Sequence, residues 1–311
     1  MLLDPETLGL SPGVERLLGP EGLKTELFSC LVETNTPICE SPDEALGELR
    51  RLRGVVAEGA AREGLVPAAT GAHPFSPPEE QQIVQEPRYL KMVDELGSKV
   101  RRQLVCGLHV HVGMESLETS LRTLNAIVPW LPPVLALSLN SPYLAGAETG
   151  MLSSRAARLL ELPRGGPPPR MTTRAEWEAE IEATGEGYTR SWWDARPHPR
   201  LGTLEVRIAD QPTSVVRSAA IAALVQALCA AAPESGWDTD AYFARREAAS
   251  RGGAATEVLL AAVEPPAREL GTWDLVETLR EPPEALLQLE LGRRDGLHAV
   301  AADLVRRSVA A

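Results

Sequence analysis

Two segments of the chain alternate between apolar and polar residues in the manner of half-buried β-strands. The first spans residues 106–113 and has the sequence CGLHVHVG. Because successive side chains of a strand point to opposite faces, His109 and His111 share one face and the aliphatic residues share the other. Glycines near its ends, Gly107 and Gly113, let another group approach the backbone closely. The pattern predicts a strand whose outer face carries two imidazoles.

The second segment, residues 203–210, has the sequence TLEVRIAD. Its aliphatic residues face one way, and Thr203, Glu205 and Arg207 face the other. Together the two segments predict strands of one sheet, with an apolar back and a polar front. We expect this front to form the floor of a polar site.

Helical spacing of apolar residues accounts for much of the remaining chain. Ser41 is a predicted N-cap, Pro42 lies in the first turn, and Glu44 completes a capping box. Gly64 predicts the end of this helix. Further predicted helices cover residues 86–97, 116–128, 173–184, 213–231, 239–250, 254–263, 272–280 and 282–309, and the sequence WLPP at 130–133 predicts a break and restart.

Strand-forming residues are concentrated at 26–36, just before Pro37, and predict one strand there. A regular strand would place Glu26 and Glu33 on opposite faces, so a shared site would require a bulge or bend between them. Other predicted strand segments are 65–70, 103–113 and a strand that begins at 192–197 and turns at 198–202.

This order of elements indicates the fold class. Mixed strands and helices come first, and residues 213–311 are mostly helical. We expect one domain over residues 1–311, an α+β fold with a largely antiparallel sheet whose back is covered by helices. The sequence contains neither a GxGxxG motif nor a P-loop, so a nucleotide would have to be held in another way.

Composition and charge narrow the function classes. The formal net charge is −12, which argues against nucleic acid as a partner. No run reaches the ~18 apolar residues of a membrane span, and the first residues do not resemble a signal peptide. The four cysteines form no CxxC pair and predict reduced thiols. We expect a cytoplasmic protein with small-molecule substrates, and the acidic surface and long helices are compatible with a homodimer.

The polar residues of the two strands allow three interpretations. His109, His111 and Glu205 together could hold a zinc ion. Alternatively, Glu205 could hold Mg²⁺ while Arg207 neutralises a transferring phosphate. In the third interpretation, Glu205 and Arg207 only pair with neighbours across the sheet. The pattern alone does not choose among them.

Six blocks of sequence occur in an order that resembles the carboxylate–amine ligase family, also called glutamate–cysteine ligase type 2. The similarity runs from the first residues to about Ala231 and is looser in the C-terminal helices. The blocks are ETNTP at 33–37, GAHPF at 71–75, HVHVG at 109–113, SLNSPY at 138–143, TG at 149–150 with SR at 154–155, and WDARP through GTLEVR at 193–207.

The resemblance implies a glutamine-synthetase-like fold, with a curved antiparallel sheet as the active-site floor. It also implies a reaction in which ATP phosphorylates a carboxylate to an acyl phosphate, which an amine then attacks to give an amide. Glutamate and cysteine are the usual acid and amine, and Mg²⁺ bridges the phosphates.

The resemblance also implies roles for individual residues. Arg207, Glu205 and His109 would be catalytic, with Arg207 gripping the transferred phosphoryl group. The implied metal ligands are Glu26, Glu33, Glu205 and His109. The implied binding residues for ATP or the substrate carboxylate are Arg155 and Arg196, with His111 and His73 in support.

One departure affects the expected activity. Family members normally have a strand with a Gly-x-Glu-x-Glu pattern before a segment like residues 2–7, and this sequence lacks it. We expect that the start site was assigned too late, since the other polar positions are intact. The alternatives are a catalytically impaired relative that acts as a binding or assembly protein, and a zinc-dependent hydrolase.

Overall fold

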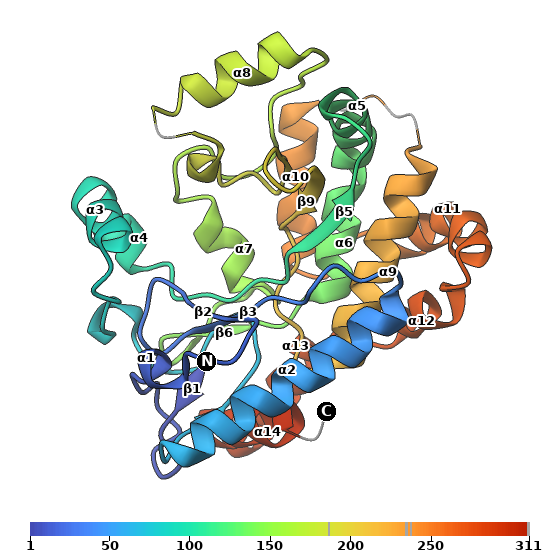
Figure 1. The fold of residues 1–311 in the computed structure, drawn as a ribbon. Helices are drawn as coiled ribbons and strands as arrows, with labels where there is room; N and C mark the ends of the chain where they lie inside the picture. Colours follow the sequence, from blue (N-terminus) through green and yellow to red (C-terminus); the bar gives the residue numbers. More distant parts are fainter. Residues whose placement is uncertain (186, 234–235, 237, 310–311) are drawn as a thin grey trace.

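The computed structural model describes residues 1–185, 187–233, 236 and 238–309. It combines helices with small antiparallel sheets, so the predicted α+β class is confirmed (Figure 1). The strands are β1 Leu2–Leu3, β2 Leu23–Thr25, β3 Val32–Thr34, β4 Val66–Pro67, β5 Val110–Gly113, β6 Tyr143–Leu144, β7 Ala147–Glu148, β8 Ala195–His198 and β9 Thr203–Val206.

Helices make up most of the second half of the chain, as predicted. The helices are α1 Val14–Leu17, α2 Pro42–Arg62, α3 Pro87–Leu96, α4 Ser98–Arg101, α5 Leu117–Ile127, α6 Leu131–Ser138, α7 Ser154–Leu159, α8 Arg174–Glu182, α9 Val215–Ala231, α10 Thr239–Ser250, α11 Thr256–Glu269, α12 Trp273–Glu277, α13 Glu284–Asp295 and α14 Leu297–Val309. Short 3₁₀ turns cover Pro78–Glu80, Val128–Trp130, Tyr188–Arg190 and Thr278–Arg280.

The two alternating segments form β5 and β9 of one sheet with the strand order β5-β9-β8, and both neighbouring pairs are antiparallel. The predicted apolar back of this sheet is confirmed, because Val110, Leu204 and Val206 are buried in one core with residues of helices α5, α6 and α9. Regular pairing of the first segment is shorter than predicted. Upstream of Val110 the extended chain makes only isolated bridges, such as that between Gly107 and Asp210.

The single strand predicted over residues 26–36 is wrong. The chain reverses between β2 and β3, which pair as a hairpin with Lys24 opposite Glu33. The apolar residues of the connection, Leu27 and Phe28, are buried in a second core, so burial bends the chain here. This is the bend that a site shared by Glu26 and Glu33 requires.

Glycine and capping residues set the helix ends. The Ser41 hydroxyl accepts the Glu44 amide N–H, as predicted, but the Glu44 carboxylate accepts the amide of Glu40 rather than that of Ser41. The single helix predicted over residues 282–309 is wrong. Gly296, with φ of 85°, interrupts it and separates α13 from α14.

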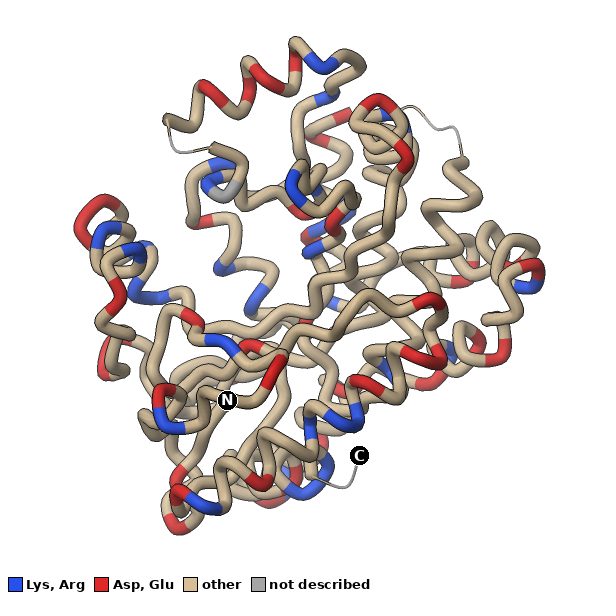
Figure 2. Tube along the Cα trace, viewed as in Figure 1, with Lys and Arg blue, Asp and Glu red and all other residues tan. Residues whose placement is uncertain are grey.

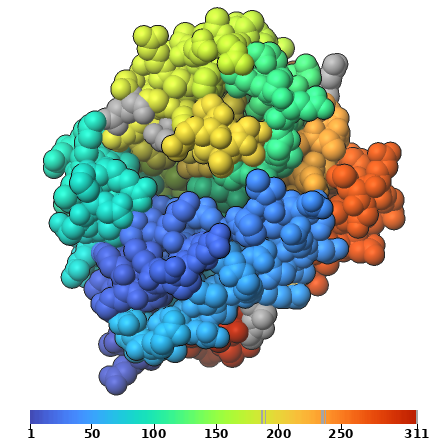
Figure 3. Space-filling model, in the orientation of Figure 1, coloured from blue at the N-terminus to red at the C-terminus, as the bar shows by residue number. Residues whose placement is uncertain are grey.

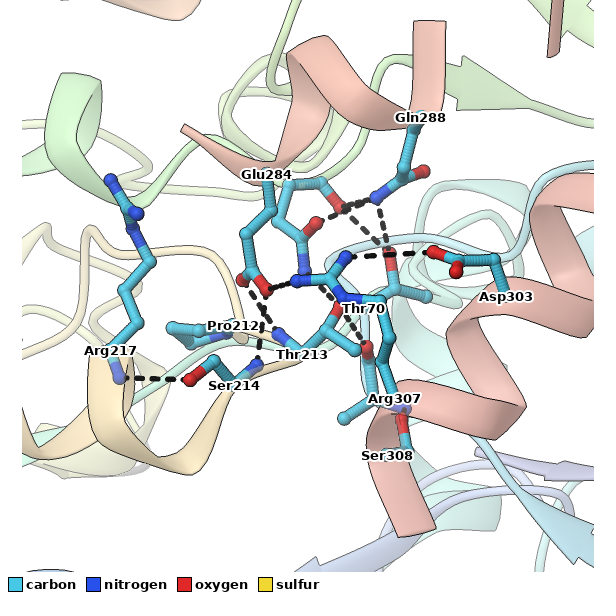
Figure 4. Close-up of polar contacts among 12 residues, drawn as sticks. Thr70, Pro212, Thr213, Ser214, Arg217, Glu284, Gln288, Asp303, Arg307 and Ser308 are labelled. Carbon is cyan, nitrogen blue, oxygen red and sulfur yellow. Dashed lines mark hydrogen bonds and ion pairs between the residues drawn. The ribbon is translucent and has the colours of Figure 1, made fainter. Parts of the chain in front are cut away.

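A buried polar network attaches α13 and α14 to the start of α9 (Figure 4). The Glu284 carboxylate accepts the backbone N–H groups of Thr213 and Ser214 at 2.8 and 3.1 Å and pairs with Arg307. Gln288 donates to Asn140 Oδ1 at 2.6 Å. The C-terminal helices are thereby tied to the segment that follows β9.

Two further expectations concern cysteines and membranes. Each of the four cysteines lies among the described residues and is unpaired, which confirms the prediction of free thiols. Every helix in the described part of the chain is too short or too polar to cross a lipid bilayer.

Candidate functional site

The site is centred on Glu205, whose carboxylate lies between two guanidinium groups. In the sheet register Glu205 is opposite His111 on β5 and Arg196 on β8, so the three side chains form one row on the polar face. Arg196 Nε donates to Glu205 Oε2 at 2.8 Å, and Arg207 donates to Oε1. The Glu205 side chain is only 3% exposed. A mixed cluster of acidic and basic residues marks this place beside β9 in Figure 2.

Two imidazoles complete the group around this carboxylate. His109 Nδ1 and His111 Nε2 lie 3.5 and 3.9 Å from Glu205 Oε1. Both rings remain partly accessible to solvent, and a hydrogen bond of 2.9 Å joins His111 Nδ1 to Thr203 Oγ1. The predicted common face for His109, His111, Glu205 and Arg207 is therefore confirmed.

Electrostatics keep the carboxylate ionised and the imidazole neutral. Burial alone would raise the pKa of Glu205, but the guanidinium groups of Arg207 and Arg196 hold it well below its usual range. Desolvation and the adjacent Arg207 lower the pKa of His109 well below its ordinary value. Two guanidinium groups around a single carboxylate leave an excess of positive charge, which favours an anion on this face.

A second acidic group lies close enough to Arg207 to interact with it electrostatically. The hairpin brings the Glu26 and Glu33 carboxyl groups within hydrogen-bonding reach of each other. Glu26 also accepts the Leu27 amide at 2.9 Å, and Glu33 accepts from the Asn35 side chain at 2.8 Å. Burial and the neighbouring Glu33 raise the pKa of Glu26 to about 7, and Arg207 is near enough to oppose this shift. The structure thus brings together residues predicted from distant segments.

Arg155 and His73 lie apart from this group. The Arg155 guanidinium is 3% exposed and donates to the backbone carbonyls of Ile208 and Arg207 at 3.0 and 2.8 Å. His73 Nε2 lies 3.0 Å from the carbonyl oxygen of Leu8, and burial lowers the pKa of His73 to about 4. Within the described residues, no hydrogen bond or ion pair joins either side chain to Glu205.

Two residues at the edge of the site, His198 and Tyr188, were not predicted from the sequence. His198, the last residue of β8, pairs with Thr203 on β9. The centroid of the His198 ring is 5.4 Å from that of the His111 ring. The Tyr188 hydroxyl is 3.1 Å from His198 Nε2. His198 could have been found by alternation, since it is two residues from Arg196 on the same strand. Tyr188 lies in a 3₁₀ turn and has no such signal.

The donor set decides which metal the site suits. Two adjacent carboxylates, Glu26 and Glu33, offer hard oxygen ligands, and Mg²⁺ is commonly bound by one or two carboxylates plus waters and substrate phosphates. The pair therefore fits Mg²⁺. In the described ranges no three His, Cys, Asp or Glu side chains are grouped to hold a metal ion. Because both oxygens of Glu205 are engaged by arginines, the zinc interpretation gains no support.

The polar face is accessible from one side of the molecule. In the space-filling view, the blue N-terminal part and the yellow segment around residue 200 lie on either side of a hollow (Figure 3). A substrate could reach the polar face where the rings of His109 and His111 are accessible to solvent.

Comparison with known proteins gives one consistent result. The family model described as glutamate-cysteine ligase family 2 (GCS2) matches residues 6–285. A Rubrobacter xylanophilus protein named "Putative glutamate--cysteine ligase 2-3" is 41% identical over 75% of this chain and 68% of its own length. A Herpetosiphon aurantiacus protein named "Putative glutamate--cysteine ligase 2" is 39% identical over 73% of this chain and 62% of its own. The chain therefore belongs to glutamate–cysteine ligase family 2.

Proposed function

We propose that this protein is an ATP- and Mg²⁺-dependent ligase with a glutamine-synthetase-like catalytic fold. It joins an amino-acid carboxylate, that of glutamate, to an amine, that of cysteine or another amino compound, through an acyl phosphate. The observation that carries the proposal is the buried Glu205 held between Arg196 and Arg207, beside the Glu26–Glu33 pair. The free cysteines suit a reducing compartment, so we place the reaction in the cytoplasm.

The proposed reaction has two steps, phosphoryl transfer to the acid and amide formation. A carboxylate oxygen of the acid attacks the γ-phosphorus of ATP, and the bond from that phosphorus to the β–γ bridging oxygen breaks to release ADP. The amine nitrogen then attacks the acyl carbon and loses a proton. Phosphate leaves with the oxygen that came from the carboxylate. Phosphorylation is needed because a carboxylate by itself is a poor electrophile.

The chain's own residues act mainly by charge and position. Arg207 presents its guanidinium group to the transferring phosphoryl, and Glu205, which also accepts from Arg196, fixes its direction. His109, kept neutral, can act as a metal or phosphate contact. Glu26 and Glu33 would hold Mg²⁺, which supplies further neutralisation of phosphate charge when bound.

The direct test measures ADP release from the purified chain with ATP, Mg²⁺ and pairs drawn from a panel of acids and amines that includes glutamate and cysteine. We expect release that requires both an acid and an amine. ADP release from no pair, or release that an acid and an amine do not stimulate, would reject the ligase proposal. The second outcome would leave the protein as an ATP hydrolase.

The raised pKa of Glu26 predicts a pH-dependent response to Mg²⁺. A carboxyl whose folded-state pKa is about 7 rather than 4.5 contributes stability below pH 4.5 that is lost as the pH rises through about 7. Mg²⁺ competes with the proton on Glu26, so its binding should strengthen over the same rise. We expect Mg²⁺ to raise the Tm more at about pH 8 than at about pH 6.

Glu26→Gln should remove this pH dependence, and Glu178→Gln, an exposed position on α8, serves as the control. A Tm response to Mg²⁺ that is the same at both pH values, or that survives Glu26→Gln, would contradict the assignment of the carboxylate pair.

A further inference from the structure

The Arg155 guanidinium lies directly against the backbone of Gly107. A Cβ atom placed on Gly107 would be 2.1 Å from Arg155 Nη2 and 2.5 Å from its Cζ. Only a glycine leaves room for the guanidinium at this position. The close approach that the sequence predicted at this end of the segment is therefore made by a buried arginine.

A second glycine accommodates the partner of Arg155. Arg155 Nη1 is 3.9 Å from Asp210 Oδ1, and a Cβ on Gly71 would be 2.8 Å from the Asp210 carboxyl group. Asp210 is fully buried and also accepts hydrogen bonds from Ser141 and Ser153 at 2.7 and 2.8 Å. Arg155 and Asp210 thus form a buried charge pair.

This pair reaches the site through the backbone of Arg207. The Arg207 carbonyl accepts from Arg155 Nη2 at 2.8 Å, and the Arg207 N–H donates to the carbonyl of Asp194, also at 2.8 Å. The Asp194 carboxylate is itself buried and accepts from Arg246 Nε and Tyr242 Oη, each at 2.8 Å. The Arg207 N–H is therefore held by the residue that precedes β8, and the Arg207 carbonyl by Arg155 at the start of α7.

We propose that Arg155 is a positioning residue that fixes the backbone of Arg207, and through it the guanidinium in the site, rather than a group that binds nucleotide or substrate. This inference rests on the proposed function only in what Arg207 does. At 3% exposure, the Arg155 side chain has little surface left for a ligand. Its guanidinium donates instead to the backbone carbonyls of Arg207 and Ile208, directly after β9.

Gly107→Ala tests this with Gly113→Ala as a matched control on the same segment. The new Cβ at Gly107 displaces the Arg155 guanidinium, whereas a Cβ at Gly113 meets no atom within 4 Å. A misplacement of about 1 Å can cost about 10²-fold in rate. We expect Gly107→Ala to lower kcat for ADP release about 10- to 100-fold with little change in the KM for ATP and acid. Gly113→Ala should stay within about twofold of the original.

A further pair of variants separates the effect of losing the positioning contact from the effect of an unbalanced buried charge. They are the single variant Arg155→Met and the double variant Arg155→Met with Asp210→Asn. The single change leaves Asp210 unpaired and should lower the Tm, and the double change should restore much of it. We expect kcat to stay low in the double variant, because nothing then donates to the Arg207 carbonyl. Recovery of kcat together with the Tm, or a large rise in KM with unchanged kcat, would overturn the proposal.

Hydrogen exchange provides a readout that does not need activity. In Gly107→Ala we expect faster exchange of the Arg207 amide while amides within α9 keep their protection. Equal loss of protection throughout, or unchanged exchange at Arg207, would refute a positioning role. If the original protein releases no ADP with any acid and amine, the proposed function fails, and the exchange experiment still decides the role of Arg155.

Discussion

Arg207→Lys lowers kcat for ADP release by about 10² to 10³-fold, with a smaller effect on the KM for ATP. An arginine that stabilises a transferring phosphoryl group is commonly worth about 10³-fold or more in kcat, and lysine supplies only part of that as a point charge. Lysine cannot donate in a fork to both Glu205 and a phosphoryl oxygen. The change retains the positive charge, so Glu205 keeps a cationic neighbour and the fold should persist.

Arg174→Lys is the control for this variant. Arg174 is an exposed residue at the start of α8 that pairs with Glu118 and Glu178, outside the site. We expect its kinetics to match the unchanged protein. Steady-state measurement of ADP release gives both parameters. If Arg207→Lys retained more than about a tenth of the original kcat, Arg207 would not be the phosphoryl-gripping residue.

The second large effect is on stability. Glu205→Gln leaves two guanidinium groups around a buried neutral amide, and loss of one partner from a buried ion pair costs about 3 to 5 kcal/mol. We expect a decrease of that size in the free energy of unfolding near neutral pH, measured by urea denaturation. Glu178→Gln, at an exposed helical position, should change it by less than about 0.5 kcal/mol.

Acid titration gives the sign of the Glu205 contribution. Because the folded-state pKa of Glu205 is depressed, its stabilisation is present above the ordinary pKa of 4.5 and is lost as the pH falls from there toward the folded-state value. The unchanged protein should therefore lose more stability over this acid range than Glu205→Gln does. Equal acid sensitivity in the two proteins would mean that Glu205 is not held ionised by Arg196 and Arg207.

Local patterns predicted the polar face of the sheet well. Strand alternation alone placed His109, His111, Glu205 and Arg207 on one side, because the two-residue repeat fixes the direction of every side chain once the strand is identified. Most helices in the second half were also predicted, since their apolar spacing repeats over several turns.

Features that depend on distant contacts were not predictable in the same way. The reversal after Glu26 has no Asn-Gly or Asp-Gly turn, and it is fixed by burial of Leu27 and Phe28 in a core assembled from many segments. The placement of Arg155 against Gly107 was missed for a similar reason. Gly107 permits close approach by another group, but only the folded chain identifies that group as Arg155.

The roles of the site residues came from resemblance to the family rather than from residue spacing. Alternation left a zinc site, a Mg²⁺–phosphate site and a plain cross-strand ion pair open. The Glu26–Glu33 pair favours the second, because it offers hard oxygen ligands near the guanidinium groups that hold Glu205.

Transfer of oxygen from substrate to phosphate tests the central proposal most directly. The acid that supports ADP release is labelled with ¹⁸O in the reacting carboxylate and incubated with ATP, Mg²⁺, the amine and the purified protein, and the released phosphate is examined by mass spectrometry. An acyl phosphate requires that one labelled oxygen appear in phosphate for each amide formed. Amide formation with unlabelled phosphate would contradict phosphoryl transfer to the carboxylate on this sheet.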